Sequence, residues 1–135
     1  MGMTDAKAAI RDRMEAEWTA TAVVYPNEHF DRPANEPWVY LEVLGAGADS
    51  TVFGSEGKRV ARDDGIIFAH VFVPVGVGEA LATQYAEQIG EIFRVQRFDG
   101  ISTGAPSVGA GEQGDDDGLY WRVSVSIPFS LHYTA

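Results

Sequence analysis

Three histidines, His29, His70 and His132, are the side chains best suited to acid–base or metal chemistry. They fall on a predicted loop, a predicted core strand and the C-terminal strand. None has a second histidine or a carboxylate at metal-ligand spacing on the same element. A lone histidine in an apolar strand is typical of a hydrogen-bonded structural residue, and we interpret His70 in that way. The chain has no cysteine, which excludes disulfides and cysteine-based sites.

Two segments have the composition of ligand-binding loops without the required spacing. Residues 45–50, GAGADS, lack the third glycine of G-x-G-x-x-G, and no helical pattern follows, so they predict a turn. The aspartates of residues 115–117 are contiguous, whereas a calcium loop spaces its ligands. We therefore interpret residues 102–118 as an acidic loop.

Known catalytic motifs are missing from the sequence. It contains no G-x-S-x-G, no P-loop and no H-E-x-x-H. The sequence predicts no catalytic residues, no cofactor and no metal. An enzyme stays open at this point, because acid–base residues can converge in the fold alone.

Length and charge narrow the function classes. The 135 residues fit a single domain over residues 1–135. The formal net charge of −10 argues against nucleic-acid binding through the overall field, and it would let DNA pass without sticking. No run approaches the roughly 18–20 apolar residues of a membrane helix. Since the N-terminus also lacks a signal-peptide core, we expect cytoplasmic synthesis and no membrane partner.

The elements that must position any site centre on the C-terminal stretch. Leu119 to Tyr133 alternates apolar and polar residues with period two, which predicts one unusually long strand, or two strands bent at Pro128, that closes the sheet. Pro128 within it fits an edge position or a bulge, because proline cannot donate to a ladder. The run Gly65 to Val75 is apolar on both sides and predicts a central strand covered on both faces.

Two amphipathic helices and several shorter strands complete the prediction. Residues 4–18 place Ile10, Met14 and Trp18 on one stripe, with Thr4 as N-cap. Residues 79–94 repeat an apolar residue every fourth position. Further strands are expected at residues 21–25, 38–44, 51–53 and 95–101, and residues 55–64 read as an exposed loop or the flared end of a hairpin.

This layout resembles the tail-terminator-like proteins of long-tailed bacteriophages and related prophage and gene-transfer-agent-like particles. The resemblance runs from EWTATAVVYPNEHFD through PWVYLEVL and GIIFAHVFVPVGVGEALA to LYWRVSVSIPFS, nearly the whole chain. Its most specific pieces are Val71–Pro74, followed by Gly76 and Gly78, and the segment V-S-V-S-I-P-F at residues 123–129.

The resemblance implies an α+β, or mixed α/β, fold: a mixed, mostly antiparallel sheet with two helices on one face. It implies a structural virion protein that assembles as a six-fold ring at the head-proximal end of the tail tube. Such a ring ends tube polymerisation and meets the head-tail connector protein, and DNA passes through it without specific binding. The family brings no catalytic residues with it.

Candidate subunit contacts are two oppositely charged segments. Lys58, Arg59 and Arg62 form what we call the basic hairpin, and Asp115, Asp116 and Asp117 form the acidic run. Opposite charges on adjacent subunits would set register and association rate. Two solvated loops without a role in assembly are the alternative.

Two other classes of function stay open from the sequence. One is another neck or tail-tube component of the virion, which would bind the connector or polymerise instead of capping tubes. The other is a small-molecule-binding or enzymatic α/β domain, which would require an enclosed pocket with convergent polar groups.

Overall fold

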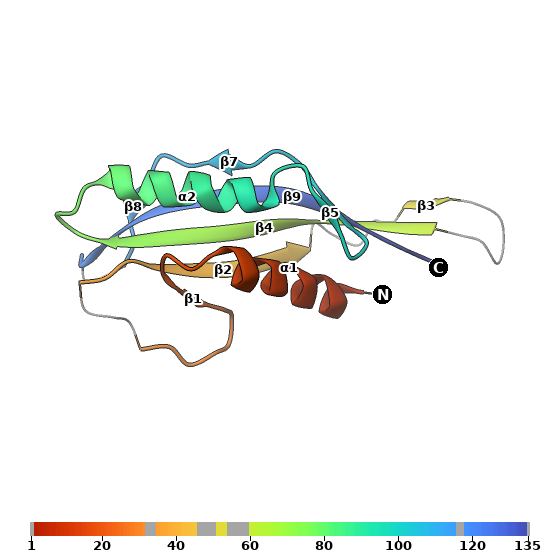
Figure 1. Cartoon of the computed structure of the whole chain (residues 1–135), viewed down its shortest axis with the longest axis horizontal. Coiled ribbons are helices and arrows are strands. Elements are labelled where there is room, and N and C mark those ends of the chain that lie inside the picture. Colours follow the sequence, from red (N-terminus) through yellow and green to blue (C-terminus); the bar gives the residue numbers. More distant parts are fainter. Residues whose placement is uncertain (1, 32–34, 46–50, 54–59, 116–117, 135) are drawn as a thin grey trace.

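A computed structural model describes residues 2–31, 35–45, 51–53, 60–115 and 118–134 of the chain (Figure 1). These residues form two helices and nine strands. The helices are α1, Met3–Glu17, and α2, Glu79–Phe93. The strands are β1, Ala22–Val24; β2, Trp38–Gly45; β3, Thr51–Phe53; β4, Val60–Pro74; β5, Arg97–Phe98; β6, Ile101–Thr103; β7, Ser107–Val108; β8, Glu112–Gln113; and β9, Tyr120–Thr134.

The strands form one mixed sheet in the order β1-β2-β4-β9-β6-β5. The β1–β2 pair is parallel and every other pair is antiparallel. Strand β3 adds to β4 beyond the end of β2, and β7 and β8 add to the outer side of β9. The α+β fold and the mostly antiparallel sheet are as predicted.

The ribbon of β4 and β9 is the axis of the molecule (Figure 1). Each strand has 15 residues, and they pair continuously from Val60 opposite Thr134 to Pro74 opposite Tyr120. Of the two predicted alternatives for the C-terminal stretch, the structure has the single long strand, but the predicted place of that strand is wrong. It lies inside the sheet between β4 and β6, and therefore does not close an edge.

Pro128 is accommodated in this inner strand by a gap in its neighbours. Its carbonyl accepts a hydrogen bond from the Gly104 N–H at 2.8 Å. Within a strand, the N–H and C=O of one residue point to the same side. The missing N–H of Pro128 therefore faces the interruption between β6 and β7, where the ladder requires no donor.

Both helices pack on one face of the sheet, as predicted. A single core joins Ile10 and Met14 of α1 and Ile89 and Phe93 of α2 to the odd-numbered apolar residues of β4 and β9. Helix α1 begins one residue earlier than predicted. Its N-cap is Gly2, whose N–H donates to the Asp5 carboxylate at 3.1 Å, so Thr4 is not the cap.

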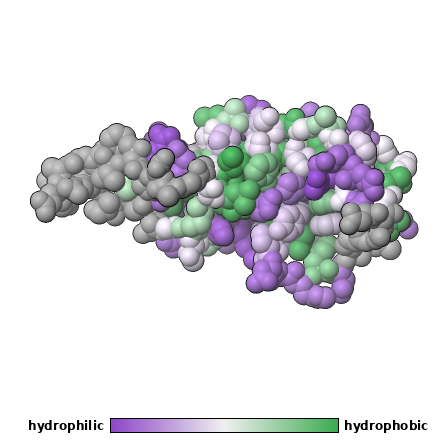
Figure 2. All heavy atoms as spheres, turned by 180° about the vertical axis from the view of Figure 1, so that it is seen from behind, coloured by the Kyte–Doolittle hydropathy of each residue, from purple (hydrophilic) through white to green (hydrophobic). Residues whose placement is uncertain are grey.

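The opposite face is covered at one end only, which corrects the prediction that β4 is buried on both faces. Trp38 stacks on Phe72 with ring centroids 4.0 Å apart, and Phe30 packs against Trp38. Farther along β4, Ile66, Phe68 and His70 are half-buried. Figure 2 views the molecule from behind and shows hydrophobic side chains gathered near its middle, with hydrophilic ones beside them.

The secondary structure of three segments differs from the prediction, because their backbone pairs with neighbouring strands. Residues 60–64, expected in a loop, are the first part of β4 and pair with β3 and β9. The expected loop at 102–118 contributes the end of β6 and all of β7 and β8, which supply partners for β9. Residues 95–101, expected to form one strand, instead contain β5, a turn and the first residue of β6. The turn is formed by Asp99 and Gly100, which have positive φ values of 48° and 81°.

Candidate assembly surfaces

The described part of the basic hairpin is Arg62, near the outer end of the β4–β9 ribbon. Lys58 and Arg59 lie outside the described residues. The Arg62 guanidinium donates to Asp64 at 2.9 and 3.3 Å, and the Ser130 hydroxyl donates to the same carboxylate at 2.8 Å. The hydrogen bond from Arg62, followed by that from Ser130, lowers the pKa of Asp64. Arg62 therefore already has a partner within its own chain, and it remains about half exposed.

Asp115 is the described member of the acidic run, since Asp116 and Asp117 lie outside the described residues. Its carboxylate accepts the backbone N–H groups of Leu119 at 2.9 Å and Tyr120 at 3.2 Å. Its carbonyl accepts from the Gln113 amide at 2.7 Å. Asp115 therefore orders the turn that leads into β9.

Arg62 and Asp115, the described residues of the two charged segments, lie at opposite ends of the ribbon. Arg62 lies opposite His132 in the β4–β9 ladder at one end. At the other end, Asp115 accepts a hydrogen bond from the N–H of Tyr120, which lies opposite Pro74. Twelve ladder positions separate residue 62 from residue 74, which corresponds to about 40 Å of strand. Nothing within one chain brings these two described residues together, so a contact between them requires two subunits.

A polar network that the sequence did not reveal lies on the open face of the sheet. The His70 Nε2 lies 2.8 Å from the Glu42 Oε1, and its Nδ1 lies 2.6 Å from the Ser124 Oγ. The three residues come from β2, β4 and β9. The ladder register places His70 directly opposite Ser124 on β9, and Glu42 lies two positions along β2 from the residue opposite His70. The network can be recognised only when the strand register is known, and the register cannot be read from the sequence.

The order carboxylate, imidazole, hydroxyl matches that of a catalytic triad, but the surroundings do not. Acyl transfer also requires N–H groups aimed at the developing oxyanion. Ser124 lies inside β9, where backbone N–H groups serve the ladder and its own carbonyl accepts from Gly109 at 2.8 Å. We interpret the network as the hydrogen-bonded structural role predicted for His70. Among the described residues, no group of three or more potential ligands could hold a metal ion.

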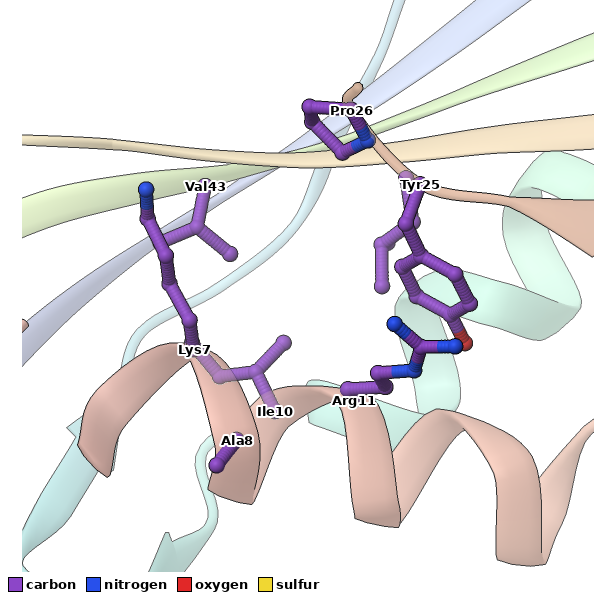
Figure 3. A pocket seen from close by; sticks show the side chains of 8 residues that line it. Lys7, Ala8, Ile10, Arg11, Tyr25, Pro26 and Val43 are labelled. Atoms are coloured by element: carbon purple, nitrogen blue, oxygen red, sulfur yellow. The ribbon is translucent and has the colours of Figure 1, made fainter. Parts of the chain in front are cut away.

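A pocket of about 360 Å³ lies between α1 and the sheet, and we call it the α1–β2 pocket (Figure 3). Its walls are mostly aliphatic, from Ile10, Leu41, Val43 and Pro26, with Ala8 at its margin. Two cations stand at its rim. The Arg11 guanidinium lies 3.9 Å over the Tyr25 ring and donates to Glu28 at 2.7 Å, whereas Lys7 reaches past Val43 on the other side.

Comparison with known proteins assigns the family. The family model described as phage tail terminator protein matches residues 5–129. The chain belongs to the phage tail terminator protein family. Tail terminator proteins are structural virion components that interact with other tail and head proteins, and this chain is accordingly a component of the phage tail.

The solved structures support the same fold. One of them is 21% identical to the chain, covers 100% of it and 99% of its own length, and superposes with a TM-score of 0.70. At that identity the likeness shows the fold alone. No curated protein matches the chain. Among the described residues of this tail terminator, no helix is long and apolar enough to cross a membrane.

Proposed function

We propose that this protein caps the head-proximal end of the phage tail tube as a closed ring, ends tube polymerisation and presents the surface that joins the head. The observation that carries the proposal is the tail terminator family match over residues 5–129, on a fold with the predicted sheet and helices. The ring is six-fold, as the family resemblance implies. Its partners are further copies of itself, the tail tube protein and the head-tail connector protein.

The placement of charge along the β4–β9 ribbon supports a ring. A cyclic assembly requires heterologous contacts, in which two different surfaces of the subunit meet and the rotation closes. Arg62 and Asp115 stand at opposite ends of the ribbon, as such contacts require. We therefore retain the basic hairpin, Lys58, Arg59 and Arg62, and the acidic run, Asp115–Asp117, as subunit-contact residues.

The ring lets DNA through without binding it specifically. The chain carries 20 acidic and 10 basic side chains, so a channel made from it repels phosphates more than it attracts them. An acidic channel lining is the corresponding structural expectation. A structure of the assembled ring with a basic channel would contradict it.

Electron microscopy of particles from a strain that lacks this gene tests the proposal. Overlong or uncontrolled tubes on headless tails are the expected result, because nothing would stop the addition of tube subunits. Tails of normal length that fail to join heads would move the protein to a connector role. Normal, infectious particles would contradict a role in tail assembly.

A further inference from the structure

Three exposed aliphatic side chains gather at one end of the β4–β9 ribbon, and we call them the apolar tip. They are Val75, Val77 and Leu119, which are 60%, 53% and 56% exposed. The Val75 N–H donates to the Leu119 carbonyl at 2.9 Å, and the Val77 N–H donates to the Pro74 carbonyl at 3.2 Å, which holds the tip together. Exposed apolar residues that cluster mark a contact surface more often than single ones do.

The surroundings of the apolar tip are acidic. Asp115 bonds the N–H of Leu119, and Asp116 and Asp117 follow it in the sequence. Glu79 is exposed in the first turn of α2, two residues after Val77. A partner for this surface would therefore combine an apolar hollow with a basic rim.

The α1–β2 pocket has that combination. Its aliphatic walls are bordered by Lys7 and Arg11 (Figure 3). Among the described residues Lys7 makes no ion pair and is exposed, so its charge is available to a second molecule. Arg11 contacts Glu28 and Glu15, which leaves Lys7 as the stronger attractant for an incoming carboxylate.

The apolar tip cannot reach the pocket of its own chain. Val43, in the pocket wall, pairs with Ile67, whereas the tip follows Pro74. Seven ladder positions separate residues 67 and 74, which corresponds to about 23 Å of strand. The apolar tip and the α1–β2 pocket are therefore two separate surfaces of opposite charge on one subunit.

We infer that the apolar tip of one copy inserts into the α1–β2 pocket of a second copy of this chain. This contact rests on the ring proposed above and gives it a specific interface. Burial of Val75, Val77 and Leu119 against Val43 and Pro26, the aliphatic pocket residues that water still reaches, supplies the affinity, because it removes apolar surface from water. The charges of Lys7 and the acidic residues near the tip set the orientation.

Disulfide trapping tests the contact directly, because the chain has no cysteine of its own. Ala8→Cys places a thiol at the exposed margin of the pocket, and Val77→Cys places one on the tip. A concentrated mixture of the two single variants, under mild oxidation, is expected to give a covalent dimer and nothing larger. Each subunit carries one thiol, so the chain of contacts ends after one disulfide.

The double variant with both substitutions is expected to give a ladder of covalent oligomers, since each copy then bonds on both sides. The matched control replaces Val77→Cys with Val108→Cys, a second exposed valine far from the tip along β9. The mixture of Ala8→Cys with Val108→Cys should stay monomeric. Equal cross-linking in both mixtures, or none in either, would overturn the contact.

The two proposals fail separately. Suppose that tails need this gene to end at their normal length, but that the tip and pocket cysteines form no disulfide in those tails. The capping role then stands, and the proposed contact is wrong. If the disulfide forms but a strain without the gene makes normal tails, the contact stands and the capping role is wrong.

Discussion

The ring of Phe129 lies over Gly65, its ladder partner across the β4–β9 ribbon. A Cβ at residue 65 would come within 2.6 Å of the Phe129 Cε1 and within 2.7 Å of the Leu44 carbonyl oxygen. The position lies where β2 ends, opposite Gly45. Glycine at position 65 lets the Phe129 ring lie over the backbone and pack in the core.

Gly65→Ala should therefore destabilise the fold. Because the Leu44 carbonyl belongs to the backbone, the added methyl group cannot be accommodated by a side-chain rotation alone. We expect a loss of about 1–3 kcal/mol in the free energy of unfolding, measured by denaturant titration. Gly2→Ala is the control, since a Cβ there meets nothing within 4 Å. Equal stability of the two variants would contradict the close approach of Phe129.

Thr103 holds the C-terminal end of α2 through its buried hydroxyl. The hydroxyl donates to the Phe93 carbonyl, and it accepts the Gln96 N–H at 2.8 Å. Thr103→Val keeps the shape but leaves both groups without this partner, so we expect a loss of about 2–3 kcal/mol. Thr103→Ser keeps the hydroxyl and should lose only about 1 kcal/mol, the cost of one methyl group. Thermal unfolding of the pair measures the difference, and a valine variant as stable as the serine variant would refute the role of the hydroxyl.

Tyr25 should make the stability of the fold depend on alkaline pH. Burial, followed by its hydrogen bond to Glu15 at 2.9 Å, raises the pKa of the phenol above its ordinary value. The unfolded chain loses this proton near pH 10, earlier than the folded one. The contribution is thus complete below pH 10 and is lost as the pH rises toward the folded pKa.

Tyr25→Phe removes this titration. Unfolding free energies of wild type and variant, measured between pH 8 and pH 11, should converge as the pH rises. At neutral pH the variant should lose about 1 kcal/mol, because one hydrogen bond is missing. A constant difference between the two proteins over this pH range would contradict the raised pKa.

The sequence predicted the strands and helices whose burial follows a regular period. Leu119 to Tyr133 and the stripes of both helices were readable because one face of each is buried, and alternation or a fourth-residue repeat follows directly. The strand at residues 60–64 was not readable. Arg62, Asp63 and Asp64 are polar, and they are extended because β3 and β9 pair with them, not because of their own preferences.

The candidate surfaces were predicted only in part, for a similar reason. The charged segments could be read from composition, but the placement of Arg62 and Asp115 at opposite ends of the ribbon depends on the ladder register. The apolar tip joins residues 75 and 77 to Leu119, which only the pairing of β4 with β9 brings together, and the pocket forms only where α1 meets β2. The network of Glu42, His70 and Ser124 joins three strands that lie far apart in the sequence. Contacts of this kind appear once the strand order is known.

Reversal of the basic hairpin should slow ring assembly. Arg59→Glu together with Arg62→Glu removes attraction toward the acidic run of a neighbour, so we expect association to slow about ten-fold at low salt. The free energy of unfolding should change little, since Arg62 and Asp64 form an exposed pair. Arg94→Glu is the control, because Arg94 is also an exposed arginine paired within its own chain, at 2.7 Å from Glu91. Light scattering follows assembly, and unchanged ring formation would exclude the hairpin from the contact.

The central claim is that this protein stops the growth of the tail tube, and growing tubes test it most directly. Purified tail tube protein would be polymerised in vitro with increasing amounts of this protein, and tube lengths would be scored by electron microscopy. The account predicts that the mean length falls as the ratio rises, with the protein present at one end of each tube. Tubes of unchanged length at a saturating amount of the protein would contradict it.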